Sequence, residues 1–341
     1  MNSGARTLKT IKTLQRMAKL IDPIMIQYLK NGADRNFIPI INYQVKTGGK
    51  RVRAALTILC CQACKGRIKD SLIPAAMIEL IHNYSLIMDD IIDHGDLRRG
   101  LPTVRAKYGD PQALLAGMFH REIIGEMALD STQPKEIHPL MVNAIKVTIE
   151  GERLDILCEQ AGRYDQYMIK NRYQDMTPKL YFKIIKKKTA ELIKSACMAG
   201  AISAKASRSY RNAIANYGEK IGLAFQVIDD FLDIFGEETG KQKGKDIIEH
   251  KLNNAAIVYA LSDMDKKQRR RFVKILQKKE LTKSNIKEAM IILESTNTKV
   301  KVLQLANDLV DDAKKSLKVL PESSAKYDLE ELADFVAARL Y

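Results

Sequence analysis

Two groups of aspartates have the residue types and spacing to bind a divalent cation. Each has the order Asp-Asp-x-x-Asp after apolar residues, first in LIMDDIID (86–93) and again in FQVIDDFLD (225–233). Aspartates four residues apart share one face of a helix, where their charges repel. Mg²⁺ relieves this repulsion, because it takes oxygen ligands and fills its shell with water or phosphate. The recurrence predicts metal ligands at Asp89, Asp90 and Asp93, and at Asp229, Asp230 and Asp233.

Cations suited to phosphate lie near both aspartate groups. The segment GGKRVR (48–53) offers backbone freedom and three cations at a predicted helix start, where anions bind well. Arg98 and Arg99 are adjacent in a glycine-bounded turn, and guanidinium groups bind phosphate through paired donors. His82 lies two helical turns before Asp89 on the same face. Further candidate cations are Lys188, Lys241, Lys245 and Lys251. Magnesium on one side and cations on the other would enclose a polyanion.

These motifs together resemble the trans-isoprenyl diphosphate synthases of the polyprenyl synthetase family, especially geranylgeranyl diphosphate synthases. The matching stretches occur in family order over roughly residues 5–260; they are GGKRVR (48–53), HNYSLIMDDIIDHGDLRRGLPT (82–103), KKT (187–189), FQVIDDFLD (225–233) and GKQKGKD (240–246). The resemblance implies the isoprenoid synthase fold, a helical bundle around a central cavity, and a homodimer that uses Mg²⁺. It also implies a chain-elongating prenyltransferase that condenses isopentenyl diphosphate with an allylic diphosphate.

The resemblance implies a role for each matching side chain. The implied direct metal ligands are Asp89, Asp93 and Asp229, supported by Asp90, Asp230 and Asp233. The allylic diphosphate would be held by Arg98, Lys188, Thr189 and Lys241, and isopentenyl diphosphate by Lys50, Arg53, His82 and Arg99. Arg51 and Lys251 are further candidate substrate contacts, and Gln226 would face the reacting centre. Neutralising the leaving diphosphate lowers the cost of forming an allylic cation, which the isopentenyl double bond then attacks with loss of a proton.

Four positions depart from the usual family pattern. Met88 stands where His commonly precedes the first aspartate pair, and Met118 where Asp often follows Leu-Ala-Gly. Glu152 stands where Gln commonly follows Gly151, and Lys245 replaces a small residue. None of them removes a predicted metal ligand or diphosphate-binding cation. The departures therefore bear on rate and substrate preference.

The residues just before the first aspartate group predict the product length. Tyr84 and Ser85 lie five and four residues before Asp89, a pattern that resembles enzymes making geranylgeranyl diphosphate. The reason is steric, since an aromatic ring is not displaced cheaply from a packed wall. Farnesyl diphosphate is the second candidate product.

Helical periodicity runs nearly from end to end and predicts the elements that position these residues. Short polar segments separate the helices, at 46–49, 65–67, 95–102, 109–111, 131–134, 175–178 and 236–244. Asp110 and Thr177, each followed by Pro, are predicted to cap helix starts. The sequence shows no alternation of strands and helices, and no linker divides the chain. We therefore predict one all-α domain of ten or more helices over residues 1–341, with a first helix from residue 6 to Leu29.

Composition narrows the functional classes. The chain has 341 residues and a formal net charge of +15, which favours phosphorylated substrates, an anionic surface or nucleic acid. No nucleic-acid-binding motif accompanies the charge, so nucleic acid is not an expected partner. The odd count of 5 cysteines, with Cys60, Cys61 and Cys64 in an apolar segment, favours buried thiols over disulfides or a zinc site. We expect a cytoplasmic protein without a transmembrane segment.

Three other functions compete with the prenyltransferase. A class I terpene cyclase also begins with Asp-Asp-x-x-Asp, but it usually carries a different second metal motif and lacks the GGKR segment. A regulatory subunit of a heteromeric synthase is the second alternative, although such partners typically lose acidic motifs that are intact here. The third alternative, a protein that binds nucleic acid or a membrane, is supported only by the net charge.

Overall fold

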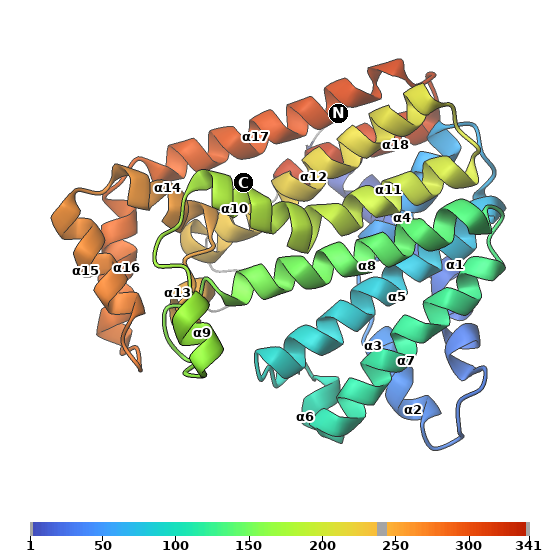
Figure 1. Cartoon of the computed structure of the whole chain (residues 1–341). Helices are drawn as coiled ribbons and strands as arrows, with labels where there is room; N and C mark the ends of the chain where they lie inside the picture. Colours follow the sequence, from blue (N-terminus) through green and yellow to red (C-terminus); the bar gives the residue numbers. More distant parts are fainter. Residues whose placement is uncertain (1–2, 237–243, 339–341) are drawn as a thin grey trace. The chain divides into compact units, whose positions relative to one another are not determined.

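The computed structural model describes residues 3–236 and 244–338, with side chains from residue 12 onward. These residues fold almost entirely as α-helices (Figure 1), which confirms the predicted all-α class with ten or more helices. The chain divides into two compact units. Unit 1 comprises Met1–Ile145, Leu192–Gly218 and Ser316–Leu332, and unit 2 comprises Lys146–Glu191, Glu219–Lys315 and Ala333–Tyr341. A single domain over residues 1–341 stays a prediction.

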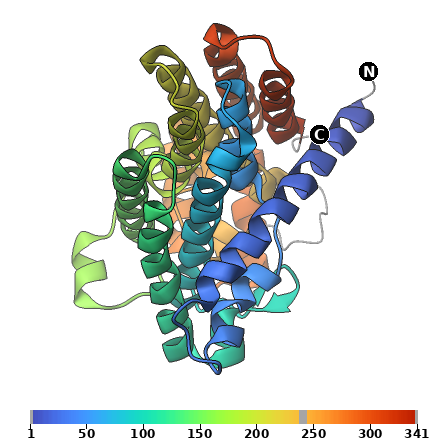
Figure 2. The same ribbon diagram turned by 90° about the vertical axis from the view of Figure 1, so that its right-hand side faces the viewer.

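Unit 1 contains the first aspartate group. Its helices, wholly or for the larger part, are α1 (Ser3–Lys30), α2 (Ile38–Ile41), α3 (Tyr43–Lys46), α4 (Val52–Ala63), α5 (Ile68–Ile92), α6 (Val104–Tyr108), α7 (Asp110–Leu129), α8 (Pro134–Ile156), α11 (Glu191–Ser203), the 3₁₀ turn η2 (Leu317–Val319) and α18 (Ser324–Ala337). Helices α1, α4 and α7 pack against α5, and α1 runs obliquely past it (Figure 2). The expected first helix is confirmed by α1.

Helix α5 is the apolar centre of unit 1. In the described part of the chain it is the one helix long and apolar enough to cross a membrane, with a mean hydropathy of 1.2. However, 67% of that apolar window is buried inside the protein. A buried core helix has the same length and composition as a membrane-spanning one, and the burial of α5 is that of a core helix.

Small residues bring the helices of unit 1 into close contact. A Cβ atom on Gly117 of α7 would lie 2.2 Å from the Met88 methyl carbon of α5. Similarly, a Cβ atom on Gly200 of α11 would lie 2.1 Å from the Thr57 carbonyl oxygen of α4. All five cysteines, three of them on or just after α4, are buried free thiols, as the sequence predicted.

Unit 2 contains the second aspartate group. Its elements, wholly or for the larger part, are α9 (Gln166–Asn171), α10 (Pro178–Ile185), the π-helical turn η1 (Lys186–Ala190), α12 (Arg208–Phe235), α13 (Lys245–Ile248), α14 (Ala255–Asp263), α15 (Lys266–Leu276), α16 (Lys283–Glu294) and α17 (Thr298–Ser316). Capping boxes at Asp265 and Thr282 start α15 and α16, which pack together (orange in Figure 1).

The predicted helix boundaries are mostly confirmed, with two corrections. Thr177 caps α10 as expected, because its side chain accepts a hydrogen bond from the Leu180 amide. Asp110 does not cap α7: Gly109 occupies the cap position, and the Asp110 carboxylate instead accepts a hydrogen bond of 2.8 Å from Arg105 Nε. The break at 95–102 holds two short strands, β1 (Leu97–Arg98) and β2 (Leu101–Pro102), where the sequence predicted no strand.

Candidate active site

The first aspartate group lies at the carboxyl end of α5, where helix dipoles disfavour negative charge. Asp89 is partly exposed and Asp93, the C-cap residue, is exposed. Asp90 is buried and engaged by Arg98, whose Nη2 and Nε donate to its Oδ1 at 2.8 and 3.1 Å. The three carboxylates therefore differ. Asp89 and Asp93 are accessible to an incoming cation, whereas Asp90 is buried against the Arg98 guanidinium.

A tight hairpin presents the two arginines that follow this group. Strands β1 and β2 are antiparallel, with Arg98 opposite Leu101. The two loop residues, Arg99 and Gly100, both have positive φ angles, 56° and 76°. Two-residue hairpin loops favour this conformation because its twist matches that of the strands. Arg98 thus turns toward Asp90, while Arg99 is held at the exposed tip.

The glycine-rich segment before α4 forms a loop around a buried arginine. Arg51 has a φ of 50°, and its side chain is 1% exposed. Its Nε donates to Asp22 Oδ1 and its Nη2 to the Val45 carbonyl oxygen, both at 2.8 Å. A Cβ atom on Gly49 would lie 3.1 Å from guanidinium nitrogens of both Arg51 and Arg99. These contacts give Arg51 a structural role; a direct contact with substrate stays a prediction.

His82 is surrounded by positive charge. Burial, followed by the charges of Arg53, Arg99, Arg98 and Arg51, holds the pKa of His82 well below its ordinary value. Partial burial and the nearby Arg51 and Arg98 also lower the pKa of Arg99. Cations this close together repel one another unless an anion joins them. The loop before α4, the face of α5 and the hairpin therefore gather a group of cations around a neutral His82 within unit 1.

The second aspartate group lies near the end of α12 and repeats the pattern of the first. Its middle residue, Asp230, is buried and accepts hydrogen bonds from Tyr181 Oη at 2.6 Å, Gln226 Nε2 at 2.8 Å and the Ala255 amide at 2.8 Å. Burial, then the charge of Asp246, raises the pKa of Asp230 well above its ordinary value. The flanking Asp229 is only partly buried, so it presents the more accessible carboxylate.

The third carboxylate of this group holds the start of α13. Asp233 accepts hydrogen bonds from the backbone amides of Lys245 at 2.9 Å and Asp246 at 3.2 Å. Burial, followed by the charge of Asp233, raises the pKa of Asp246 to about 6. Lys241, predicted to hold the allylic diphosphate, lies outside the described residues.

Lys188 and Thr189 belong to the π-helical turn η1, a local widening often found at functional sites. Thr189 Oγ1 donates to Gln226 Oε1 at 2.6 Å, so it fixes the amide that reaches Asp230. Lys188 Nζ contacts two carboxylates of α8, Glu152 Oε2 at 2.7 Å and Asp155 Oδ2 at 2.5 Å. A continuous polar network therefore connects η1 with the second aspartate group.

Lys251 belongs to the same network, because it approaches the Asp155 oxygen that Lys188 contacts. Its Nζ lies 2.8 Å from Glu249 Oε2 and 3.9 Å from Asp155 Oδ2. Burial alone would raise the pKa of Asp155, but the charges of Lys188 and Lys251 more than offset it and lower the pKa to about 2. The structure thus brings Lys251 to Asp155; its predicted contact with substrate stays a prediction.

The donor chemistry of both aspartate groups fits magnesium. In the described part of the chain, no three His, Cys, Asp or Glu side chains converge closely enough to hold a metal by themselves. Magnesium needs only one or two protein carboxylates when phosphate and water complete its shell. Asp89, Asp93 and Asp229 provide hard oxygen ligands of this kind, so their type and accessibility suit a cation that arrives with a diphosphate.

Tyr84 and Ser85 lie on α5 one turn before the first aspartate group, both partly buried. Ser85 Oγ donates to the His82 carbonyl oxygen at 2.9 Å, so its hydroxyl is satisfied within the helix. Met88 fills the contact with Gly117 of α7. This packing gives the departure at Met88 a local explanation, because a flexible thioether adapts to a glycine surface.

Several residues that shape the site were not predicted from the sequence. Asp155 and Asn253 hold the cluster around Lys188, and Tyr181 positions Asp230. Glu79, buried in α5, accepts a hydrogen bond from the Ala54 amide at 3.0 Å and lies 3.9 Å from Arg51 Nη1. The spacing of Asp155, one helical turn after Glu152, was the one available signal. Tyr181 has no charge or motif that marks it.

Comparison with known proteins gives a consistent family. Residues 35–293 match the family model described as polyprenyl synthetase. A short chain isoprenyl diphosphate synthase of Methanothermobacter thermautotrophicus is 34% identical over 337 residues, covering 97% of this chain and 99% of the relative. The crystal structure of geranylgeranyl pyrophosphate synthetase from Pyrococcus horikoshii superposes with a TM-score of 0.87 at 30% identity, covering 96% of this chain and 98% of that one.

A second solved structure was determined with ligands. It is a polyprenyl synthase from Caulobacter crescentus, complexed with calcium and isoprenyl diphosphate. Its TM-score is 0.84 at 27% identity, and the match covers 97% of this chain and 98% of that one. The isoprenoid synthase fold expected from the sequence is therefore confirmed. The chain belongs to the polyprenyl synthetase family and is a chain-elongating trans-prenyltransferase.

Proposed function

We propose that this enzyme condenses isopentenyl diphosphate with an allylic diphosphate in the presence of Mg²⁺, and that its main product is geranylgeranyl diphosphate. The observation that carries the proposal is the group of cations around His82, which lies two turns before Asp89 on α5. Arg53, Arg99 and a neutral imidazole suit one diphosphate. The adjacent carboxylates suit a metal ion that accompanies a second diphosphate.

The side chains then have separable tasks. Asp89, Asp93 and Asp229 would hold Mg²⁺, which when bound would neutralise the negative charge that develops on the leaving diphosphate. Arg98, Lys188 and Thr189 would bind the allylic diphosphate, assisted by Lys241. Lys50, Arg53, His82 and Arg99 would bind isopentenyl diphosphate and orient its double bond. The carbon–oxygen bond of the allylic substrate breaks, the double bond attacks the resulting cation, and the new cation loses a proton.

Gln226 has a bond pattern suited to the reacting centre. Its amide oxygen accepts from Thr189 and its amide nitrogen donates to Asp230, so the side chain is fixed in one orientation. A neutral amide held in this way is compatible with an adjacent carbocation. Asp90 would act indirectly by fixing Arg98, whose side chain stays 32% exposed in this ion pair.

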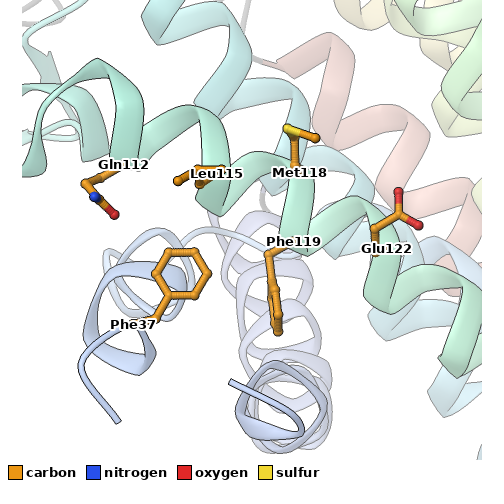
Figure 3. Close-up of a pocket in the computed structure, with 6 residues that line it drawn as sticks. All are labelled: Phe37, Gln112, Leu115, Met118, Phe119 and Glu122. Carbon is orange, nitrogen blue, oxygen red and sulfur yellow. The ribbon is translucent and has the colours of Figure 1, made fainter. Parts of the chain in front are cut away.

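We also propose that the enzyme works as a homodimer through α7. Leu114, Leu115 and Met118 are 47%, 51% and 53% exposed there, an unusual set for a water-facing surface. Leu115 and Met118 line a surface pocket of about 370 Å³, together with Phe37, Gln112, Phe119 and Glu122 (Figure 3). A second copy would cover this apolar face. Analytical ultracentrifugation should find a dimer, and Met118→Glu should shift it toward monomer.

A test of the activity combines the purified protein with Mg²⁺, labelled isopentenyl diphosphate and each allylic diphosphate in turn. A twenty-carbon alcohol after dephosphorylation, lost on adding EDTA, is the expected result. Asp89→Asn should abolish it, whereas Asp96→Asn, an exposed carboxylate paired with Arg105, should not. A fifteen-carbon product would favour farnesyl diphosphate instead. No extension with any primer would refute the assignment and favour a regulatory subunit.

The compartment is proposed as cytoplasmic. Five buried free cysteines suit a reducing environment, and none forms a disulfide. Fractionation of the native cells, with product formation assayed in each fraction, would test this assignment.

A further inference from the structure

Two carboxylates of α8 hold the ammonium group of Lys188. Glu152 Oε2 lies 2.7 Å and Asp155 Oδ2 2.5 Å from Lys188 Nζ. Glu152 and Asp155 are three residues apart, so they project from one helix face toward the same point. One ammonium group thus has two anionic partners, although one would neutralise it.

The backbone fixes this arrangement. A Cβ atom on Gly151 would lie 2.3 Å from the Lys188 amide nitrogen, so α8 and η1 touch along their main chains. Lys188 cannot move far from Glu152 unless its side chain swings away. The side chain of Lys188 is 27% exposed, against 14% for Glu152 and 5% for Asp155. Lys188 is therefore the member of the group that can turn toward a ligand.

The two carboxylates are not equivalent. Asp155 also accepts a hydrogen bond from Asn253 Nδ2 at 2.7 Å and lies 3.9 Å from Lys251 Nζ, so it has other partners without Lys188. The ion pair of Glu152 that the structure gives is with Lys188. Glu249 also pairs with Lys245 at 3.0 Å, so three carboxylates of the cluster face three ammonium groups. Glutamine at position 152 would remove the charge of Glu152 and keep Asp155 beside Lys188.

We propose that Glu152 is a positioning residue that competes with the substrate diphosphate for Lys188. The inference depends on the proposed role of Lys188 in binding the allylic diphosphate. A diphosphate can use Lys188 only by displacing Glu152 or by accepting its repulsion nearby. Glu152 therefore weakens binding of the allylic diphosphate and speeds release of the diphosphate-bearing product.

The test is the isosteric substitution Glu152→Gln. The ion pair between Glu152 and Lys188 is partly exposed, so its loss should have a moderate effect. We expect the Kd for inorganic diphosphate, measured by calorimetry with Mg²⁺, to fall roughly fivefold. The KM for the allylic diphosphate should fall by a similar factor, while the KM for isopentenyl diphosphate stays unchanged. A merely structural role would not separate the two substrates. Glu150→Gln, on the same helix but paired with the exposed Arg153, is the control and should change neither constant.

Lys188→Gln distinguishes the two ways in which the test can fail. Weaker diphosphate binding in Lys188→Gln, together with no tightening in Glu152→Gln, would overturn the competition while leaving the proposed role of Lys188 intact. Unchanged binding in Lys188→Gln would overturn both. In the double variant the effect of Glu152→Gln should disappear, because the competition acts through Lys188. Weaker binding in Glu152→Gln would reverse the proposed sign and refute it.

Discussion

Gly151→Ala should destabilise the protein at the contact between α8 and η1. The added methyl carbon would lie 2.3 Å from the Lys188 amide nitrogen and 2.6 Å from its Cα atom, whereas ordinary contacts begin at 3.4 Å. The main chains must therefore separate by about 3.4 − 2.3 = 1.1 Å. Overpacking against atoms that cannot rotate away costs about 3 kcal/mol. Alanine returns about 1 kcal/mol of helix propensity, so the net loss is about 2 kcal/mol.

Urea-induced unfolding, followed by far-ultraviolet circular dichroism, measures this loss. The matched control is Gly125→Ala in α7, where an added Cβ meets no atom within 4 Å. That variant should gain about 1 kcal/mol, because only the propensity term acts. If Gly151→Ala were as stable as the wild type or gained like Gly125→Ala, the close contact of α8 with η1 would be wrong. Because η1 carries Lys188 and Thr189, Gly151→Ala should also weaken binding of inorganic diphosphate.

Three further predictions concern unit 1. Burial lowers the pKa of His120 to about 4, below its unfolded value of 6.5. Between these values the unfolded chain binds a proton that the folded protein does not. We therefore expect the folded protein to lose about 3 kcal/mol of stability on acidification from about pH 7 to pH 4. His120→Gln should lose correspondingly less over that range in urea unfolding, and parallel losses would contradict the assignment. Tyr84→Ala should lengthen the product sized by chromatography, and an unchanged distribution would remove Tyr84 as the limit. Arg51→Lys should cost about 2 kcal/mol in the same urea assay, because one ammonium group cannot replace the guanidinium nitrogens that reach both Asp22 and Val45. A stability within about 0.5 kcal/mol of the wild type, the ordinary range for surface substitutions, would refute this prediction.

The fold was predictable because local signals and helical periodicity agree along most of the chain. The predicted break at 46–49 separates α3, which ends at Lys46, from α4, and Thr177 with Pro178 begins α10, as expected. The hairpin at 97–102 was missed because its two-residue strands are too short to show any periodicity. Asp110 was misjudged because the glycine before it took the cap position, leaving its carboxylate to Arg105.

The site was predictable where function demands unusual residue types, and not where it depends on burial. Paired aspartates and arginines are costly to place near an apolar helix, so their recurrence was informative. A linear pattern does not show which member of a pair turns inward. Arg51 and Arg53 were both candidate substrate contacts, yet Arg51 is buried against Asp22. Likewise, the partners of Lys188 come from a helix more than thirty residues earlier in the chain.

The five cysteines, described above as buried thiols, also make the enzyme convenient for site-specific labelling. Burial raises the pKa of Cys61 to about 11 and of Cys64 to about 12, so few thiolates exist at neutral pH to react with maleimides. Burial likewise raises the pKa of Cys60 and Cys158. A single cysteine introduced on an exposed helix face should therefore be modified selectively without removing any native thiol. Fluorophore or spin-label pairs placed in this way would report distances between chosen helices as substrates bind.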